Sequence, residues 1–461
     1  MKLAILGSGP GGYVAAVRAA QLGAEVTVIE EDEVGGTCLN WGCIPTKSLV
    51  SSSEMFFRAK RLQEFGIETT GTISPNFLKI LERKNRIVNL QIKGIRNLFK
   101  FHRITLQEGR GQLISPSEIA FTSKNGSHGT VKADRIIVAT GSRPFQLPGF
   151  PFDGKQILST DDVFSLDAIP KSLIIIGAGV SGCEFACIFR QLGSEVTILE
   201  KLPRALSTED TEISEIFERE LKKRGIRLLS NITINKVDTR DGSIRVFLTD
   251  GTELEAERAL VSVGRSLNSD GIGLEKVGIG KGVGGEIIAN EKMETNISGI
   301  YAVGDVIGGH MLAHVASAEG IVAANNSMGG DERADYSSVP SAIFTSPEIA
   351  SVGIRGQQAA EMGIKVRTGH FQFRTLAKSH IMGEIEGMIK IISDESSDRI
   401  VGVHMIGPHA SDLIHEAVLA VSKGLKTTDI SRIMHAHPTL SEVLQEAAAD
   451  VHGEAIHAQK K

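Results

Sequence analysis

The chain has 461 residues, of which 41% are hydrophobic, and its 50 basic and 55 acidic residues give a formal net charge of −5. This length is enough to bury more than one hydrophobic core and predicts about three domains. The acidic balance, without a long run of lysine or arginine, disfavours nucleic acid as a partner. No stretch is apolar over the roughly 20 residues that a membrane-spanning helix needs, and the first residues lack the long apolar core of a secretory signal. We therefore expect a cytoplasmic protein with no membrane partner, in which a disulfide is catalytic rather than structural.

Two segments of the sequence repeat each other. LAILGSGPGGYVAAVRAAQLGAEVTVIE begins at Leu3 and LIIIGAGVSGCEFACIFRQLGSEVTILE begins at Leu173, and roughly half of their aligned positions are identical. Each copy reads as an apolar strand, a glycine turn, a helix, a second strand and a terminal glutamate. The repeat therefore predicts two βαβ dinucleotide-binding units.

Glycines and acids stand at the fingerprint positions of both units. The glycines allow a tight turn, close approach to a pyrophosphate and close helix packing; they are Gly7, Gly9 and Gly12, then Gly177, Gly179 and Gly182. Glu30 and Glu200 end the second strands, where a carboxylate accepts hydrogen bonds from ribose hydroxyls and repels a 2′-phosphate. Glu200 thus favours NAD over NADP, although Lys201 and Arg204 leave the alternative open. Two units suggest a flavin and a nicotinamide, between which hydride passes readily.

Cys38 and Cys43, in GGTCLNWGCIPTK from Gly35, follow Glu30 by about one loop. They could be zinc ligands together with Cys183 and Cys187, inert buried thiols, or a redox pair. The second pair sits on the glycine-led helix of the second unit and is predicted to be core thiols. Cys38 and Cys43, in contrast, are expected beside the cofactor of the first unit, which favours a redox pair. Lys47 is a candidate cation for lowering a thiol pKa.

Thiol chemistry near neutral pH also needs a base, and His437 in HAHPTLSE is the candidate. Pro438 disfavours helical geometry at His437 and places the imidazole on an extended loop. Thr439 and Glu442 fit the S/T-x-x-E capping box, which would make Glu442 structural. Alternatively, Glu442 orients the imidazole in one tautomer. The spacing leaves both roles open.

These motifs together resemble one family, the flavoprotein disulfide reductases, over essentially the whole chain. The motifs are GSGPGG from Gly7, GGTCLNWGCIPTK from Gly35, ATGSRP from Ala139, GAGVSGCEFA from Gly177, SVGR from Ser262, YAVGD from Tyr301, MLAH from Met311, GVHMIGPHASDLIHEA from Gly402 and HAHPTLSE from His435. The resemblance implies oxidation of a protein-bound dihydrolipoyl group by NAD through FAD and a redox-active disulfide. It also implies a homodimer that serves a lipoylated acyltransferase or a lipoyl carrier protein, and no metal.

The resemblance assigns roles residue by residue. The residues implied for FAD are Gly7, Gly9, Gly12, Glu30, Thr37, Lys47, Gly111, Thr140, Gly141, Asp305 and Ala313. Those implied for NAD are Gly177, Gly179, Gly182, Glu200, Gly264 and Arg265. Cys38 would attack the substrate and Cys43 would face the flavin. Lys47 would pair with Glu184. His437 would be the acid–base group that serves the disulfide of the other subunit, and Glu442 would orient this histidine.

The implied fold class is α/β, with two Rossmann-like dinucleotide-binding domains, for FAD and NAD, and a C-terminal α+β dimerisation domain. The expected bounds are 1–144 for the FAD domain, 145–268 for the NAD domain, 269–335 for a return to the FAD domain, and 336–461 for the dimerisation domain. An apolar stripe over 76–99 predicts a helix with a buried face. MIKIIS from Met388 and IVGVHMIG from Ile400 predict paired antiparallel strands, with helices from Asp412 and Ser441.

Other functions stay open at this point. Glutathione reductase and mercuric reductase use the same cysteine spacing, but Glu200 disfavours the first and the tail VHGEAIHAQKK lacks the cysteine pair of the second. A redox-inert flavoprotein, kept as a scaffold or sensor, would not need Cys38, Cys43, Lys47 and His437. Trp41, Leu267 and RTLAKSH from Arg374 depart from the family's commonest pattern and leave substrate access and dimer contacts open.

Overall fold

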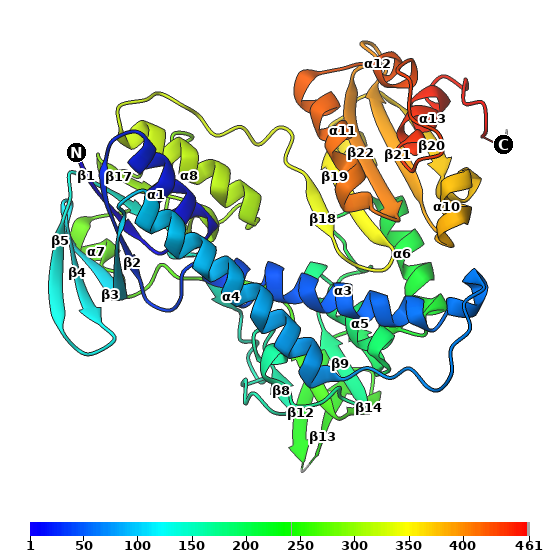
Figure 1. Ribbon diagram of the computed structural model, residues 1–461, viewed down its shortest axis with the longest axis horizontal. Helices are drawn as coiled ribbons and strands as arrows, with labels where there is room; N and C mark the ends of the chain where they lie inside the picture. Colours follow the sequence, from blue (N-terminus) through cyan, green and yellow to red (C-terminus); the bar gives the residue numbers. More distant parts are fainter. Residues whose placement is uncertain (241, 459–461) are drawn as a thin grey trace.

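The computed structural model describes residues 1–240 and 242–458. Figure 1 shows three lobes that meet around the helices α3 (Cys43–Ala59) and α4 (Phe77–Phe101). The first lobe holds the N-terminus, the second lies below it in green, and the third holds the C-terminus in orange and red. None of the described helices is both long and apolar enough to cross a bilayer.

The first lobe is a seven-stranded sheet in the order β17-β6-β1-β2-β3-β4-β5. Its strands are β1 (Lys2–Leu6), β2 (Glu25–Glu30), β3 (Thr105–Ser115), β4 (Glu118–Ser123), β5 (His128–Lys132), β6 (Arg135–Val138) and β17 (Ile300–Ala302). β17 pairs in parallel with β6, so the chain returns to this sheet after the second lobe. The helices α1 (Pro10–Gln21) and α8 (Ala313–Ser327) lie side by side in Figure 1. They approach so closely that a Cβ on Gly320 would lie 2.4 Å from the carbonyl oxygen of Gly11.

The second lobe repeats the arrangement with a parallel sheet in the order β11-β10-β9-β15-β8. Its strands are β8 (Ile157–Leu158), β9 (Ser172–Ile176), β10 (Glu195–Leu199), β11 (Arg227–Leu229) and β15 (Arg258–Val261). The helices α5 (Val180–Leu192) and α6 (Thr211–Lys223) belong to it, as does an antiparallel sheet of β12 (Ile234–Arg240), β13 (Ser243–Leu248) and β14 (Glu253–Ala256). Two short strands, β7 (Ser142–Pro144) and β16 (Arg265–Leu267), pair where the chain passes between the lobes.

The third lobe is an antiparallel sheet in the order β18-β19-β22-β21-β20. Its strands are β18 (Ser341–Ile343), β19 (Glu348–Gly353), β20 (Val366–Gln372), β21 (Met388–Asp394) and β22 (Ile400–Gly407), and its helices are α9 (Gly356–Glu361), α10 (Ala377–Met382), α11 (Ala410–Lys423), α12 (Thr427–Ser431) and α13 (Glu442–Asp450). The predicted pair β21–β22 is confirmed. α11 begins two residues before the predicted start, after His409, which adopts a left-handed conformation (φ 55°).

The remaining elements are short. They are α2 (Gly36–Asn40), α7 (Leu274–Val277) and the 3₁₀ turns η1 (Leu62–Phe65), η2 (Asp162–Ser165), η3 (Gly304–Ile307) and η4 (Phe373–Thr375). The helix predicted over 76–99 is α4, which Asn76 caps by accepting a hydrogen bond from the backbone N–H of Lys79 at 3.1 Å. Its stripe of Leu81, Val88 and Ile95 is buried, as expected.

A buried polar contact joins the second and third lobes. Asp210, the N-cap of α6, is fully buried, and both its carboxylate oxygens lie 3.2 Å from Nζ of Lys390 on β21. Asp210 also accepts the backbone N–H of Gly356 at 2.9 Å. A carboxylate and an ammonium buried together persist only because each satisfies the other. The predicted α/β class with two nucleotide-binding sheets and an α+β third domain is confirmed, and the four domain boundaries stay a prediction.

Candidate functional site

The glycine turn of the first unit leaves open backbone at the N-terminus of α1. Gly7 has φ +97°, and a Cβ there would lie 2.3 Å from the carbonyl oxygen of Ala139. A Cβ on Gly12 would lie 2.1 Å from the carbonyl oxygen of Gly7, so neither position tolerates a side chain. Around Gly9, in contrast, the nearest atom stands 4.0 Å away. Unpaired N–H groups at the start of α1 and open space above them fit a dinucleotide pyrophosphate.

The second unit has the same turn. Gly177 has φ +102°, and a Cβ there would meet the carbonyl oxygen of Ser262 at 2.2 Å. A Cβ on Gly182 would meet the carbonyl oxygen of Gly177 at 2.0 Å. Gly179 and Gly264 have no neighbouring atom within 4 Å of an added Cβ. The two turns therefore pack alike and expose backbone alike.

Glu30 and Glu200 stand beside these turns in matching geometry. One carboxylate oxygen of Glu30 accepts hydrogen bonds from the backbone N–H and hydroxyl of Ser8, both at 2.7 Å, and the other accepts the N–H of Asp32 at 2.9 Å. Glu200 accepts the N–H of Ala178 at 2.5 Å and that of Leu202 at 2.8 Å. Each carboxylate is thus fixed at the end of its strand, where ribose hydroxyls could donate to it.

Cys38 and Cys43 lie on consecutive helices. Cys38 is in the middle of α2, and Cys43 is the first residue of the 17-residue α3, where the helix dipole favours a negative charge. Both are half-buried free thiols. A hydrogen bond from Cys38 and the charge of Lys47 lower the pKa of Cys43 to about 7, although burial raises it. The same hydrogen bond and burial raise the pKa of Cys38. The reduced pair therefore holds its thiolate at Cys43 and its proton at Cys38.

Lys47 and Glu184 form an ion pair next to the thiols. The ammonium of Lys47 lies 2.9 Å from both carboxylate oxygens of Glu184, whose side chain is 3% exposed. The backbone N–H of Phe344 donates to the same carboxylate at 2.9 Å, and the ammonium lies 4.7 Å from the centre of the Phe344 ring. The pair thus links α3 to α5 and to the chain that follows β18. The Glu184 carboxylate therefore joins α3, α5 and the start of the third lobe beside the thiols.

Trp41 lies between the two cysteines and connects their segment to Glu30, the carboxylate expected to bind the ribose in the first unit. Its indole N–H donates to the carboxylate of Asp32 at 3.1 Å, and the backbone N–H of Asp32 donates to Glu30 at 2.9 Å. The Trp41 side chain is partly exposed. The departure from the commonest family pattern at this position therefore adds a contact to Asp32, just after the strand that ends at Glu30.

Glu442 contacts both His437 and Thr439, the partners in the two roles that the sequence left open. One of its carboxylate oxygens lies 2.8 Å from Nδ1 of His437, and the other accepts the backbone N–H of Thr439 at 2.8 Å. The expected capping box does not form, because α13 begins at Glu442 with Ser441 at its N-cap, which leaves Thr439 outside the helix. An ionised Glu442 selects the tautomer with its proton on Nδ1. The His437 side chain is 72% exposed, which leaves Nε2 facing outward as a proton acceptor.

The remaining residues implied for FAD border the junction of the first two lobes. Thr37 donates to the carbonyl of Ser142 at 3.3 Å, and Thr140 donates to the carbonyl of Asn268 at 2.8 Å. The Ser142 hydroxyl donates to the carboxylate of Asp305. Gly141 has open space around it, and Ala313 starts α8. Gly111 serves packing, because a Cβ there would lie 2.5 Å from Leu6.

Arg265 lies on this junction rather than beside Glu200. Its guanidinium donates to the hydroxyl of Ser142 at 2.6 Å and to the carbonyl of Ser142 at 2.9 Å, and it stands 3.7 Å from the carboxylate of Asp305. Its implied role in binding NAD stays a prediction. The sequence did not single out Ser142, which contacts Arg265, or Phe344, which contacts Glu184. In both cases the partner lies more than a hundred residues away along the chain.

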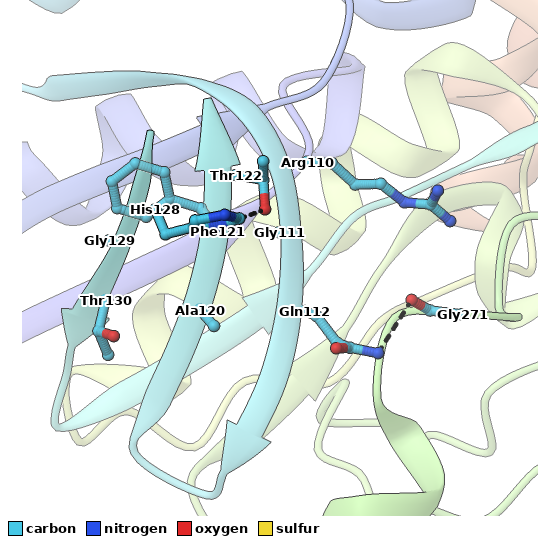
Figure 2. A pocket seen from close by; sticks show the side chains of 10 residues that line it. All are labelled: Arg110, Gly111, Gln112, Ala120, Phe121, Thr122, His128, Gly129, Thr130 and Gly271. Carbon is cyan, nitrogen blue, oxygen red and sulfur yellow. Dashed lines mark hydrogen bonds between the residues drawn. The ribbon is translucent and has the colours of Figure 1, made fainter. Parts of the chain in front are cut away.

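A separate hollow of about 590 Å³ opens on the sheet of β3, β4 and β5 (Figure 2). Gln112 donates to the carbonyl of Gly271 at 3.4 Å, and the Thr122 hydroxyl contacts Nδ1 of His128 at 3.1 Å. Among the residues singled out above, only Gly111 belongs to its lining. Because its lining residues include no thiol and no acid–base pair, we assign it no chemistry.

Comparison with known proteins identifies the family. Residues 1–320 match the model of the pyridine nucleotide-disulphide oxidoreductases, and residues 339–448 match the dimerisation domain of the same family. The chain is 42% identical to a dihydrolipoyl dehydrogenase of Bacillus subtilis, covering 98% of each protein. It is 39% identical to a mitochondrial dihydrolipoyl dehydrogenase of Pisum sativum, covering 98% of this chain and 92% of that one.

A solved structure agrees with these relatives. LpdA from Mycobacterium tuberculosis superposes with a TM-score of 0.92 at 32% identity, covering 97% of this chain and 99% of that one. The family implied by the sequence is thereby confirmed, and the third lobe is its dimerisation domain. The chain belongs to the pyridine nucleotide-disulphide oxidoreductases.

Proposed function

We propose that the protein is a dihydrolipoyl dehydrogenase, which oxidises dihydrolipoyl groups with NAD through a redox-active disulfide and FAD. Its substrates would be carried by a lipoylated acyltransferase or a lipoyl carrier protein of a multienzyme complex. The observation that carries the proposal is the thiol pair: Cys43 is a helix-start thiol of lowered pKa that accepts a hydrogen bond from Cys38. The relatives named above, which match almost the whole chain, supply the substrate class.

The site residues fit the two cofactors. The open turns at Gly9 and Gly179 and the fixed carboxylates of Glu30 and Glu200 would hold FAD in the first unit and NAD in the second. Bound FAD would accept two electrons beside Cys43 and deliver them as hydride to NAD. A preference for NAD over NADP is supported by Arg204, whose guanidinium is engaged by the carbonyls of Ser207 and Glu209 at 3.1 and 3.3 Å.

The dithiol half of the reaction would use four side chains. Nε2 of His437 takes the proton of one substrate thiol, and the resulting thiolate attacks Sγ of Cys38. The Cys38–Cys43 bond breaks, and Cys43 leaves as the thiolate that Lys47 and the start of α3 stabilise. The second substrate thiol then attacks the substrate sulfur of the mixed disulfide. Lipoyl disulfide is released, its proton goes to Cys38, and the other proton stays on His437.

The active unit would be a homodimer. His437 is exposed on the dimerisation domain, and within the described residues no hydrogen bond joins its loop to the segment of Cys38 and Cys43. A second copy would bring its disulfide to this imidazole. Cys183 and Cys187 are buried free thiols in the core around α5, which is compatible with a cytoplasmic location.

The test is the rate of NADH formation from dihydrolipoamide and NAD, with NADP as a parallel cosubstrate. Reduction of glutathione disulfide and of mercuric ion by NADPH tests the two related reductases. A fast rate with NAD and dihydrolipoamide alone is expected. Turnover of another disulfide without dihydrolipoamide would reject the substrate. An unchanged number of titratable thiols after addition of NADH would reject the redox chemistry in favour of a scaffold or sensor.

A further inference from the structure

The residues 432–438 form an exposed loop between α12 and α13, and this loop carries His437. Met434 is fully exposed and Ile433 is largely exposed, so the loop buries little apolar surface of its own. Its shape must come from hydrogen bonds. Two of these come from α13, the helix that directly follows: Gln445 donates to the carbonyl of Ile433 at 3.1 Å, and Glu442 binds His437.

A third contact ties the loop to a different helix. Nε2 of His435 lies 3.1 Å from a carboxylate oxygen of Glu416 on α11, and the His435 side chain is 5% exposed. Among the described residues this is the one hydrogen bond from the loop to an element other than α13. It is therefore the contact that fixes the loop against the body of the dimerisation domain.

Both partners of the His435 ring accept hydrogen bonds. Its Nδ1 lies 3.3 Å from the carbonyl oxygen of Ile433, and its Nε2 faces Glu416. A carbonyl and an ionised carboxylate only accept hydrogen bonds. Both contacts are satisfied together when the ring carries both protons. The ring is then one half of a largely buried ion pair.

This charge also reaches the acid that orients His437. Burial raises the pKa of Glu442, but hydrogen bonds from His437 and Thr439 and the positive charges of His437 and His435 lower it below its usual value. An ionised Glu442 is what holds the proton on Nδ1 of His437 and leaves Nε2 free. His435 thus supports the base by holding its loop through Glu416.

We propose that Glu416 and His435 are positioning residues for His437, which hold its loop and so set the direction of its Nε2. The inference rests on the proposed function, because it takes His437 to be the base for the substrate thiol. The chain offers a matched control in the same domain. Glu446 on α13 pairs with His457 at 2.7 Å, and among the described residues no hydrogen bond joins either of them to the loop.

The experiment compares the two half-reactions of the FAD-containing dimer by rapid mixing. In Glu416→Gln, reduction of the enzyme by dihydrolipoamide is expected to slow by about tenfold or more, since a misdirected base loses much of its advantage. Reduction by NADH does not use His437 and should keep its rate. The pH profile of the dithiol half-reaction should shift, because a displaced loop alters the hydrogen bond between His437 and Glu442. Glu446→Gln should change none of these rates.

Each result decides the matter. A dithiol rate within twofold of the parent rate, or an equal fall in both half-reactions, rejects a positioning role. If Glu416→Gln does not assemble as a dimer, His435→Phe is measured instead, because it fills the same buried space without a hydrogen bond to Glu416, and the same selective fall in the dithiol rate is expected. His437→Gln is run in parallel. Full dithiol turnover in that variant overturns the assignment of the base itself, whereas its loss together with an unaffected Glu416→Gln overturns only the positioning role.

Discussion

Glu184→Gln is expected to destabilise the protein and at the same time to make Cys43 more acidic. The amide is isosteric and can still accept the N–H of Phe344, so the change removes mainly the charge that faces Lys47. Breaking a fully buried ion pair costs about 3–5 kcal/mol. Because the Lys47 side chain is 30% exposed, solvent screens part of this loss, and about 2–3 kcal/mol remains. For a cooperative unit of 461 residues this corresponds to a fall in Tm of about 2–3 °C.

The effect on the thiol has the opposite sign. The negative charge of Glu184 raises the pKa of Cys43, so its removal lowers this pKa below about 7. The pKa is measured in the reduced protein from the rate of alkylation against pH. Glu220→Gln is the control: its partner Lys223, at 2.6 Å, is 58% exposed, so that pair contributes less than about 1 kcal/mol and lies outside the thiol site. An unchanged Tm, or a raised pKa of Cys43, would show that Glu184 does not act as described.

Three further results are expected. In the reduced protein the alkylation of Cys43 should reach half its maximal rate near pH 7, and Cys38→Ala, which removes the hydrogen-bond donor, should move this midpoint upward toward 9; a midpoint that stays near 7 would assign the acidity to another cause. Lys390→Met should lower the free energy of unfolding in urea by about 3 kcal/mol or more, because Asp210 stays buried without its cation, and a loss below 1 kcal/mol would contradict that account. Glu200→Ser should raise kcat/KM for NADP relative to NAD by at least about tenfold, as measured by steady-state kinetics with both cosubstrates; an unchanged ratio would mean that another residue discriminates against the 2′-phosphate.

The parts of the fold that follow from local pattern could be predicted from the sequence. Both βαβ units, the helix α4 and the pair β21–β22 depend on apolar period and on glycines within about 30 residues, and the structure contains all of them. Helix starts were less accurate, because the end of a helix depends on single capping contacts. α13 begins at Glu442, one residue after the predicted start, and Thr439 lies before its N-cap Ser441.

The contacts between lobes could not be predicted from the spacing of residues in the sequence. Phe344 meets Glu184 across 160 residues, and Lys390 meets Asp210 across 180. No spacing rule connects such positions, because their approach depends on how complete lobes pack. The same holds for Glu416 and His435, which stand 19 residues apart on separate elements. The chemistry of the thiols was readable because Cys38, Cys43 and Lys47 lie within one short segment, whereas the residues that tune it do not.

The position of Trp41 gives the protein its own optical reporter. It is the only tryptophan in the chain, so the whole tryptophan emission comes from the segment between Cys38 and Cys43. Its indole N–H donates to the carboxylate of Asp32, whose backbone N–H in turn donates to Glu30. Emission intensity and wavelength therefore respond to opening or closing of the thiol pair and to occupation of the first nucleotide unit, without any label. Single-turnover kinetics of both events can be followed in the unmodified protein.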